Sequence, residues 1–402
     1  MSPGRAAALA AAVVAALCAG LWLGGHPGEL PGPLRDAFVD DAASLTAEAT
    51  EVIEDNYFRS VDPTQLRDSS VDGMVRALRR RYEDRFSHYF DPEDLASFRE
   101  AIRGKFSGVG LTVTEVKRGL RVGRVFAKTP AAKAGIAVGD VIVSVEGRSI
   151  AGEDSEVVTA KIKGPAGTEV TIGVLRPSSG RRRSLTLTRA EIEIPITTSH
   201  VRRVEGVELG HVQLISFTEG AHAALRGAVQ RAREKGAEGI VLDLRGNGGG
   251  LLQEAVLTAS LFLEEGEVIV STESRTEGER VYEAVGGKLA PLPLVVLINR
   301  DSASAAEILA AALSEQAGAT LVGTRSFGKG VFQQVIDLSN GGALDLTIGE
   351  YFTPEGVNLS GKGVAPDVRA LDRPRTRPDE ALREAFAVLA GELRAEAAPA
   401  AD

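Results

Sequence analysis

Two serines in this 402-residue chain follow an apolar stretch that suits a buried strand. The stretch is residues 294–298, and Ser302 and Ser304 come next, at the start of a pattern that predicts a helix over residues 303–316. Amides at a helix start direct their N–H bonds toward developing negative charge, so a serine there is well placed for nucleophilic attack. Serine is also a common helix N-cap, and this segment alone favours a cap. One serine can cap the helix while the other attacks.

A lysine flanked by glycines follows 25 residues after Ser304. Gly328 and Gly330 place Lys329 in a tight loop before the segment Val-Phe-Gln-Gln-Val at residues 331–335. A serine nucleophile needs a base near neutral pH, and no histidine lies in or near either segment. Lysine can serve as that base when burial lowers its pKa. Taken alone, a loop lysine is more often simply exposed to solvent.

A third segment is rich in glycine and follows a buried-strand pattern at residues 239–244. It reads Asp-Leu-Arg-Gly-Asn-Gly-Gly-Gly over residues 243–250. Glycine lets a carbonyl oxygen approach the backbone closely, which suits an oxyanion hole. A phosphate-binding loop is the alternative, but neither the G-x-x-x-x-G-K-[ST] order nor a G-x-G-x-x-G pattern is present.

The elements that must position these segments fall into regions of different character. Residues 35–105 show helical spacing of apolar residues, and residues 106–192 show short alternating strands separated by turn residues. Residues 205–370 alternate strands with helices, which predicts an α/β core. A final helix is predicted over residues 378–396, and the basic run at residues 181–183 is interpreted as a solvated hairpin turn.

The N-terminus has the pattern of an export signal. Arg5 is followed by an apolar run over residues 6–25, which is about long enough to span a bilayer as a helix. The run is long and Ala-rich for a signal core, so an uncleaved membrane anchor is the alternative interpretation. Cys18 lies within it, after a leucine that makes a poor lipoprotein cleavage context. With the positive end inside, the rest of the chain is expected outside the cytoplasm.

Composition narrows the classes of function. Net charge is −9, and no extended basic face is apparent, so we expect no nucleic-acid binding. The single cysteine leaves the body of the chain without a disulfide, a thiol nucleophile or a cysteine metal cluster. The five histidines show no metal-binding spacing. We therefore expect neither a metal nor another cofactor.

Taken together, these segments resemble the C-terminal processing peptidases, also called tail-specific proteases or serine peptidase family S41. The family pattern S-A-S-A-S-E reads S-A-S-A-A-E at residues 302–307, and the family's F-G-K-G is present at residues 327–330. The resemblance implies that Ser304 is the nucleophile, that Lys329 is its base, and that Gln333 supports the lysine. Ala306 replaces a serine that is frequent in relatives and is not their nucleophile.

The resemblance also extends to the glycine-rich segment, which matches the family loop D-L-R-x-N-x-G-G. It implies an oxyanion hole made by the amide of Ala305 together with that of Gly248 or Gly249. In the mechanism this implies, neutral Lys329 takes the proton from Ser304, and Ser304 attacks the scissile carbonyl. Water then hydrolyses the acyl-enzyme.

Residues 106–192 resemble a PDZ domain. Residues 129–142 match the helix, turn and strand of the PDZ domains of bacterial proteases. The segment that looks like the carboxylate-binding loop includes Gly108, Val109, Gly110 and Leu111. Backbone amides there would hold the C-terminus of a substrate while its tail adds to the sheet as an edge strand. A purely structural β domain is the alternative.

The combined prediction is a serine endopeptidase with a Ser304–Lys329 dyad that cuts proteins near their C-termini while the PDZ domain holds the tail. The expected fold is multidomain α+β, with an N-terminal helical segment, a PDZ-like β domain and an α/β core of the crotonase or ClpP type. The expected boundaries are a signal or transmembrane anchor and linker at 1–34, a helical region at 35–105, the PDZ domain at 106–192, the protease core at 193–375, and a C-terminal helix with an Ala-rich tail at 376–402.

The expected partners are protein substrates with unstructured, apolar C-terminal tails, the membrane through residues 6–25, and a second copy of the chain through the terminal helices. The expected location is extracytoplasmic, in the periplasm or on the outer face of the membrane. Two other classes stay open at this stage. An inactive PDZ scaffold would not hydrolyse unfolded proteins, and a crotonase-like acyl-transfer enzyme would need a basic pocket for coenzyme A.

Overall fold

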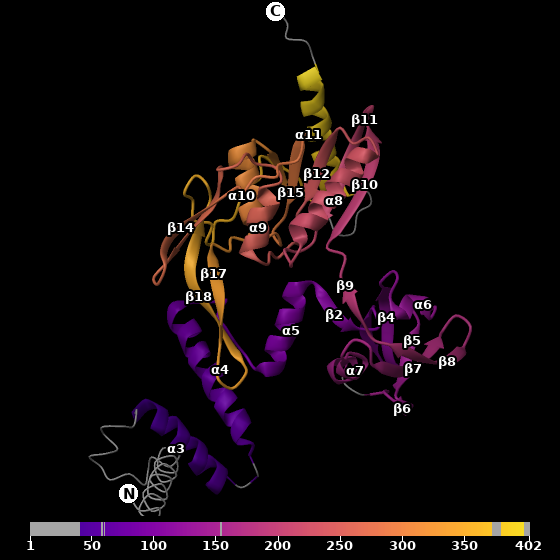
Figure 1. Cartoon of the computed structure of the whole chain (residues 1–402), viewed down its shortest axis with the longest axis vertical. Helices are drawn as coiled ribbons and strands as arrows, with labels where there is room; N and C mark the ends of the chain where they lie inside the picture. Colours follow the sequence, from indigo (N-terminus) through magenta and orange to yellow (C-terminus); the bar gives the residue numbers. More distant parts are fainter. Residues whose placement is uncertain (1–40, 58, 60, 153–154, 372–378, 398–402) are drawn as a thin grey trace, which may run out of the picture. The chain divides into compact units, whose positions relative to one another are not determined.

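The computed structural model describes residues 41–402 except 58, 60, 153–154, 372–378 and 398–402 (Figure 1). The predicted anchor at residues 6–25 lies outside the described residues. Among the helices that are described, none is long and apolar enough to cross a membrane. The chain divides into two compact units, one formed by the residues up to 91 with 335–346 and the other by 92–334 with 347–402.

The first unit is mainly helical. Its elements are α3 (Asp41–Asn56), α4 (Pro63–Tyr82) and β1 (His88–Phe90). Helix α4 begins at Pro63 because Asp62 caps it. The Asp62 carboxylate accepts a 2.8 Å hydrogen bond from the Thr64 amide, and proline suits the first helical position. Strand β1 pairs antiparallel with residues 343–345.

The second unit begins with α5 (Pro92–Arg103) and continues into a β domain. A curved sheet in the order β3-β4-β5-β7-β8 leaves β3 at a free edge, and β6 pairs with β5. The elements of this domain are β2 (Lys105–Gly108), β3 (Leu111–Val116), β4 (Gly119–Val125), α6 (Pro130–Lys133), β5 (Val141–Val145), β6 (Arg148–Ser149), α7 (Ser155–Ile162), β7 (Glu169–Arg176), β8 (Arg181–Thr188) and β9 (Ala190–Glu193).

Two details of this domain differ from the sequence prediction. The arginines at residues 181–183 are not a hairpin turn but the first residues of β8, paired with β7 from Arg176 onward. The turn lies just before them, where Gly180 has a φ of 67°. Helix α7 was not predicted, because its eight residues are too few to show helical periodicity clearly.

The remaining residues of the second unit form the α/β core. A six-stranded sheet has the order β10-β11-β12-β15-β16-β19, and a second sheet contains β13, β14, β17 and β18. The elements are β10 (Thr197–Val204), β11 (Val207–Leu214), α8 (Ala221–Glu234), β12 (Gly239–Asp243), α9 (Leu252–Ala259), β13 (Val268–Ser274), β14 (Gly278–Glu283), β15 (Leu294–Ile298), α10 (Ala305–Ala317), β16 (Thr320–Gly323), β17 (Val331–Asp337), β18 (Ala343–Phe352), β19 (Val368–Arg369) and α11 (Glu380–Ala397).

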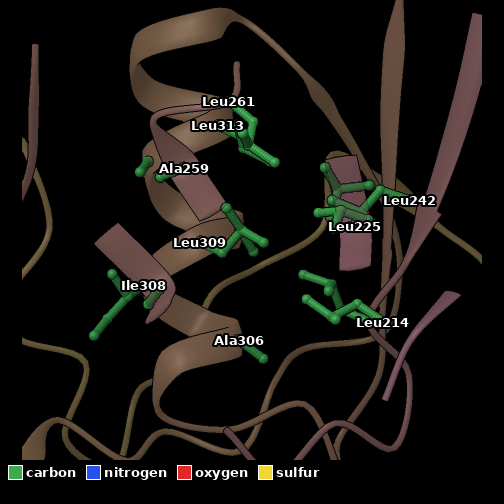
Figure 2. Packing of buried hydrophobic residues seen from close by; sticks show 14 of the residues in the cluster. Leu214, Leu225, Leu242, Ala259, Leu261, Ala306, Ile308, Leu309 and Leu313 are labelled. Atoms are coloured by element: carbon green, nitrogen blue, oxygen red, sulfur yellow. The ribbon is translucent and has the colours of Figure 1, made fainter. Parts of the chain in front are cut away.

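Both faces of the six-stranded sheet are covered, which explains why β15 is apolar throughout and β12 is apolar up to its last residue, Asp243. Leu242 and its neighbours on one face pack against α8, α9 and α10, whereas Val241 and Val295 on the other face pack against α11. Figure 2 shows Leu309 and Leu313 of α10 pointing toward this first face.

The parallel order of the sheet brings the chemistry-bearing loops together. Strands β12, β15 and β16 are parallel neighbours, so their C-terminal ends meet at the same edge. The glycine loop follows β12, the two serines follow β15, and the lysine loop follows β16. Ligands of open α/β sheets generally bind at this carboxyl edge.

Candidate active site

Ser304 has an unusual backbone conformation. It is the N-cap of α10, with φ 56° and ψ −119°, a region that residues other than glycine rarely adopt. A sharp turn of this kind between a strand and a helix presents the nucleophile of many hydrolases at the end of a sheet. The helix that follows is fixed, because Ala305 to Leu313 are all buried. The half-buried Ser304 side chain is therefore held on a rigid element.

Ser302 has a different role. It is fully buried, and its hydroxyl donates a 2.8 Å hydrogen bond to the carbonyl of Leu244 while it accepts one from the amide of Asn299. These bonds join the loop after β15 to the end of β12. Ser302 is thus closed to substrate, and of the two serines only Ser304 is accessible.

Glu307 connects the serine loop to the lysine loop, and sequence reasoning did not identify it. Its fully buried carboxylate accepts hydrogen bonds from the amides of Ser304 (2.8 Å), Gly328 (2.7 Å) and Lys329 (2.9 Å), and from the hydroxyl of Ser326. The amides of Ser304 and Lys329 bond the same oxygen, Oε2. Their nitrogen atoms are therefore no farther apart than the sum of these two distances.

Lys329 and Gln333 meet as the resemblance implies. The half-buried Lys329 Nζ donates a 2.6 Å hydrogen bond to Gln333 Oε1, and Gln333 Nε2 donates to Thr347 Oγ1 at 3.1 Å. The flanking glycines are needed sterically. A Cβ on Gly330 would lie 2.3 Å from the Ser360 amide, and one on Gly328 would meet backbone at about the minimum contact distance.

Tyr351 of β18 is the second residue that the sequence did not reveal. Its side chain is almost fully buried, and its hydroxyl donates to the carbonyl of Lys329. Burial raises the pKa of Tyr351 well above its usual value, against the opposing effect of a hydrogen bond with the Ser304 side chain. The phenol therefore stays protonated and contacts both loops.

The glycine loop lies against Ser304. A Cβ on Gly249 would come within 2.8 Å of Ser304 Cβ and of the Ala303 carbonyl, so only glycine fits there. The Gly249 amide already donates to Asn247 Oδ1 at 2.9 Å. Among the described residues, the amides of Gly248 and Ala305 have no hydrogen-bond acceptor. Backbone donors of this kind suit an oxyanion.

An ionic cluster supports the glycine loop from the side of α11. Arg245 bonds Asp243 (2.7 Å) and Asp379 (2.8 Å), and His211 Nε2 lies 3.0 Å from Asp243. Burial would raise the pKa of Asp243, but hydrogen bonds from His211 and Arg245 outweigh it and hold that pKa below its usual range. Burial would also raise the pKa of Asp379, but hydrogen bonds, chiefly from Arg245, outweigh it and lower that pKa.

The residues predicted to bind a substrate tail lie elsewhere in the second unit, between β2 and β3. Gly108 ends β2, Leu111 begins the edge strand β3, and Val109 and Gly110 are buried between them. The carbonyl of Val109 accepts from the Ala131 amide at 2.8 Å, and that of Gly110 from the Phe126 amide at 3.0 Å. The loop is therefore rigid and stands at the start of a free strand edge.

No cluster of three or more metal-binding side chains occurs within the described part of the chain.

Comparison with known proteins gives consistent matches. The sequence model of Peptidase family S41 matches residues 208–370, and that of the PDZ domain matches residues 107–188. The carboxy-terminal-processing protease of Bartonella bacilliformis is 36% identical over 324 residues, which cover 79% of this chain and 72% of that protein. Carboxy-terminal processing protease CtpA of Bacillus subtilis is 34% identical, covering 80% of this chain and 68% of that protein.

Two solved structures are also similar to this chain. The photosystem II D1 C-terminal processing protease is 31% identical and covers 87% of this chain and 98% of its own, with a TM-score of 0.48. A Bacteroides fragilis protein described as an S41 protease is 17% identical. It covers 86% of this chain and 97% of its own, with a TM-score of 0.51.

Proposed function

The chain belongs to peptidase family S41, and on that premise we propose that Ser304 and Lys329 form the catalytic dyad of this C-terminal processing serine protease. The observation that carries the proposal is the Glu307 carboxylate, which bonds the amides of both residues through one oxygen. A shared anchor of this kind fixes the distance between nucleophile and base before substrate arrives.

The proposed reaction proceeds through an acyl-enzyme. Neutral Lys329 accepts the proton of the Ser304 hydroxyl as Oγ attacks the scissile carbonyl carbon. The amide of Ala305 and that of Gly248 or Gly249 hold the oxyanion, and the lysine then gives its proton to the leaving amine. Water attacks the ester in a second, equivalent step and restores the serine. Gln333 orients the lysine throughout by accepting from Nζ.

The dyad is tested by cleavage of an unfolded protein that carries a free apolar C-terminus. We expect Ser304→Ala and Lys329→Ala each to reduce kcat/KM by at least about a thousandfold, because the variants lose nucleophile or base. Lys362→Ala is the matched control, since Lys362 is an exposed lysine of a neighbouring turn, and it should cut like the unmodified enzyme. If both dyad variants cut normally, the assignment is wrong.

We propose further that the PDZ domain captures the substrate tail at the loop of residues 108–111. The free edge of β3 supports this, since an extended chain can add there as a further strand of the sheet. The expected ligand is an unstructured tail with small apolar end residues. A tail peptide should bind the full chain, and amidation of its C-terminal carboxylate should abolish binding. Equal binding of both forms would contradict carboxylate capture.

Three proposals concern the cellular setting and rest on other features. The apolar run at residues 6–25 supports export with a cleaved signal or a retained anchor, and an extracytoplasmic location. N-terminal sequencing of the mature protein distinguishes cleavage from retention.

A homodimer is supported by exposed apolar side chains on α3 and α4, such as Leu45, Met74 and Tyr82. Sedimentation of the purified chain would show a monomer if this is wrong.

A further inference from the structure

The PDZ domain is positively charged within an acidic protein. Residues 107–188 contain 13 Lys and Arg against 7 Asp and Glu, whereas the whole chain has 46 against 55. A domain of opposite sign in one chain indicates attraction toward a negatively charged partner.

Four of the cations surround a hollow of about 640 Å³ on this domain, called here the basic hollow. Lys117 and Arg118 lie in the turn between β3 and β4, and Arg121 and Arg182 lie on β4 and β8. All four are exposed, and within the described residues none has an ion-pair partner. No acidic residue lines the hollow, and Val141 and Leu175 contribute apolar surface.

Strand register explains why the cations converge. Arg121 is directly opposite Val141, Val141 is opposite Leu175, and Leu175 is opposite Arg182. Directly paired residues point to the same face of a sheet, so both arginines share the face that carries these apolar residues. The face is the outer one, because Leu120 and Val122, which flank Arg121, are buried in the core.

The basic hollow also stands at one end of the free strand edge. The proposed carboxylate loop precedes β3, so a bound tail runs antiparallel to β3 with its C-terminus at Leu111. Strand β3 extends over six residues, to Val116, which itself lines the hollow. At about 3.3 Å per residue, a tail reaches the hollow roughly six residues before its C-terminus.

We infer that the basic hollow binds acidic side chains that lie about six to nine residues upstream of the substrate's C-terminus, so that preferred substrates combine an apolar end with an acidic preceding segment. The inference rests on the proposed tail binding. A membrane surface with anionic lipids has compatible charge, but the cations surround a concavity that continues from a peptide-sized strand edge. That arrangement favours an extended polypeptide.

The test uses three fluorescent peptides that share one apolar C-terminal end and carry Glu, Gln or Lys at about the seventh and eighth positions from the C-terminus. Their dissociation constants for the full-length Ser304→Ala chain are measured by anisotropy. We expect the Glu peptide to bind about three- to tenfold more tightly than the Gln peptide, with the Lys peptide weakest. The advantage should shrink as salt rises, because exposed charges are screened.

Charge reversal makes the test specific. Arg118→Glu should remove the preference for the Glu peptide, and Lys117→Glu/Arg118→Glu should transfer it to the Lys peptide. Arg148→Glu is the matched control for Arg118→Glu, since Arg148 is an exposed arginine on β6, outside the hollow, and its replacement changes the net charge by the same amount. It should keep the preference for Glu.

The outcomes distinguish this inference from the proposed capture of the substrate tail, on which it rests. Equal binding of the three peptides, with loss of binding on amidation, overturns the inference and leaves tail capture intact. Binding that ignores amidation overturns both. If the Lys117→Glu/Arg118→Glu chain keeps its peptide preference but loses affinity for phosphatidylglycerol vesicles, the hollow is a lipid site and the inference is wrong.

Discussion

Glu307 is the residue that connects the proposed nucleophile, Ser304, to its proposed base, Lys329. A buried carboxylate with no partner is very costly, yet this one accepts four hydrogen bonds and lies in the first turn of α10, where the helix dipole favours negative charge. As an acceptor of four bonds it has no need of a cation. These four hydrogen bonds offset the cost of burying the Glu307 carboxylate, and they also hold the loops of Ser304 and Lys329 together.

Replacing Tyr351 tests whether its hydroxyl positions the loops of Ser304 and Lys329. In Tyr351→Phe the Lys329 carbonyl loses its buried donor, which costs about 1–3 kcal/mol, and the contact with Ser304 is lost. We expect kcat to fall about ten- to a hundredfold with KM little changed, because the substrate is not contacted directly. The measurement is steady-state cleavage of a tail-bearing peptide.

Tyr282→Phe is the control, since Tyr282 is a half-buried tyrosine on β14 that packs on the core. It should retain activity. A Tyr351→Phe enzyme with unchanged kcat would show that the phenol does not position the dyad. The raised pKa of Tyr351 adds a second expectation, namely that its removal deletes no ionisation from the pH–rate profile.

At the scale of elements, the loops after β12 and β15 work as one unit. The Ala303 amide donates to the Asn247 carbonyl at 2.9 Å, and the fully buried Asn247 side chain donates to the Leu214 carbonyl at the end of β11. Gly249 then approaches Ser304 more closely than any side chain would allow. The proposed oxyanion donors are therefore positioned by backbone packing between strands.

Gly249→Ala is expected to inactivate the enzyme. The new Cβ would lie 2.8 Å from the Ala303 carbonyl and from Ser304 Cβ, at a φ of 98° that disfavours alanine. Gly246→Ala is a matched control in the same loop, with φ 70° but no atom within 4 Å of its Cβ. It should cost only about 1 kcal/mol of stability and retain activity. Equal activity of both variants would refute steric control by Gly249.

At the scale of the whole molecule, the Asp243–Arg245–Asp379 cluster makes the docking of α11 sensitive to acid. Both carboxyl groups have a pKa lowered in the folded state, because hydrogen bonds outweigh the effect of burial. Those bonds come from His211 and Arg245 for Asp243 and chiefly from Arg245 for Asp379. A group with a depressed folded pKa contributes stability above its unfolded value, about 4, and loses it as pH falls through the folded value. The cluster therefore stabilises the protein at neutral pH and not in strong acid.

Asp379→Asn tests this linkage. Asp379 is partly exposed, so solvent screening limits the loss to about 1 kcal/mol at pH 7. The loss should shrink as pH falls below about 4 and disappear once pH is below the lowered folded pKa of Asp379, because the unmodified carboxyl group is then protonated. Urea unfolding midpoints at pH 7 and at the most acidic pH at which the protein still folds provide the measurement. A deficit of the same size at both would mean that charge is not involved.

Several features of this protein follow from local sequence alone. The limits of β15 are those of its apolar run, and α5 begins at the Pro92 that signals a helix start. The glycine loop and the Gly-Lys-Gly segment are visible because glycine and buried-strand patterns are local signals. Charge runs were less informative, since the arginines at 181–183 belong to β8 and not to a turn.

Other features were decided only by the tertiary structure. Ser302 and Ser304 are alike in sequence, but the parallel packing of β12 and β15 buries one against Leu244 and leaves the other accessible. The Ser304 amide is a local partner of Glu307, but the lysine-loop partners of Glu307 and the Lys329 carbonyl that Tyr351 bonds lie about twenty residues away. Those contacts form only when strand order and register are set, so the sequence carries no signal of them. Local patterns determine which elements form. The order in which they pack determines which side chains do chemistry, because those contacts do not exist until the sheet is assembled.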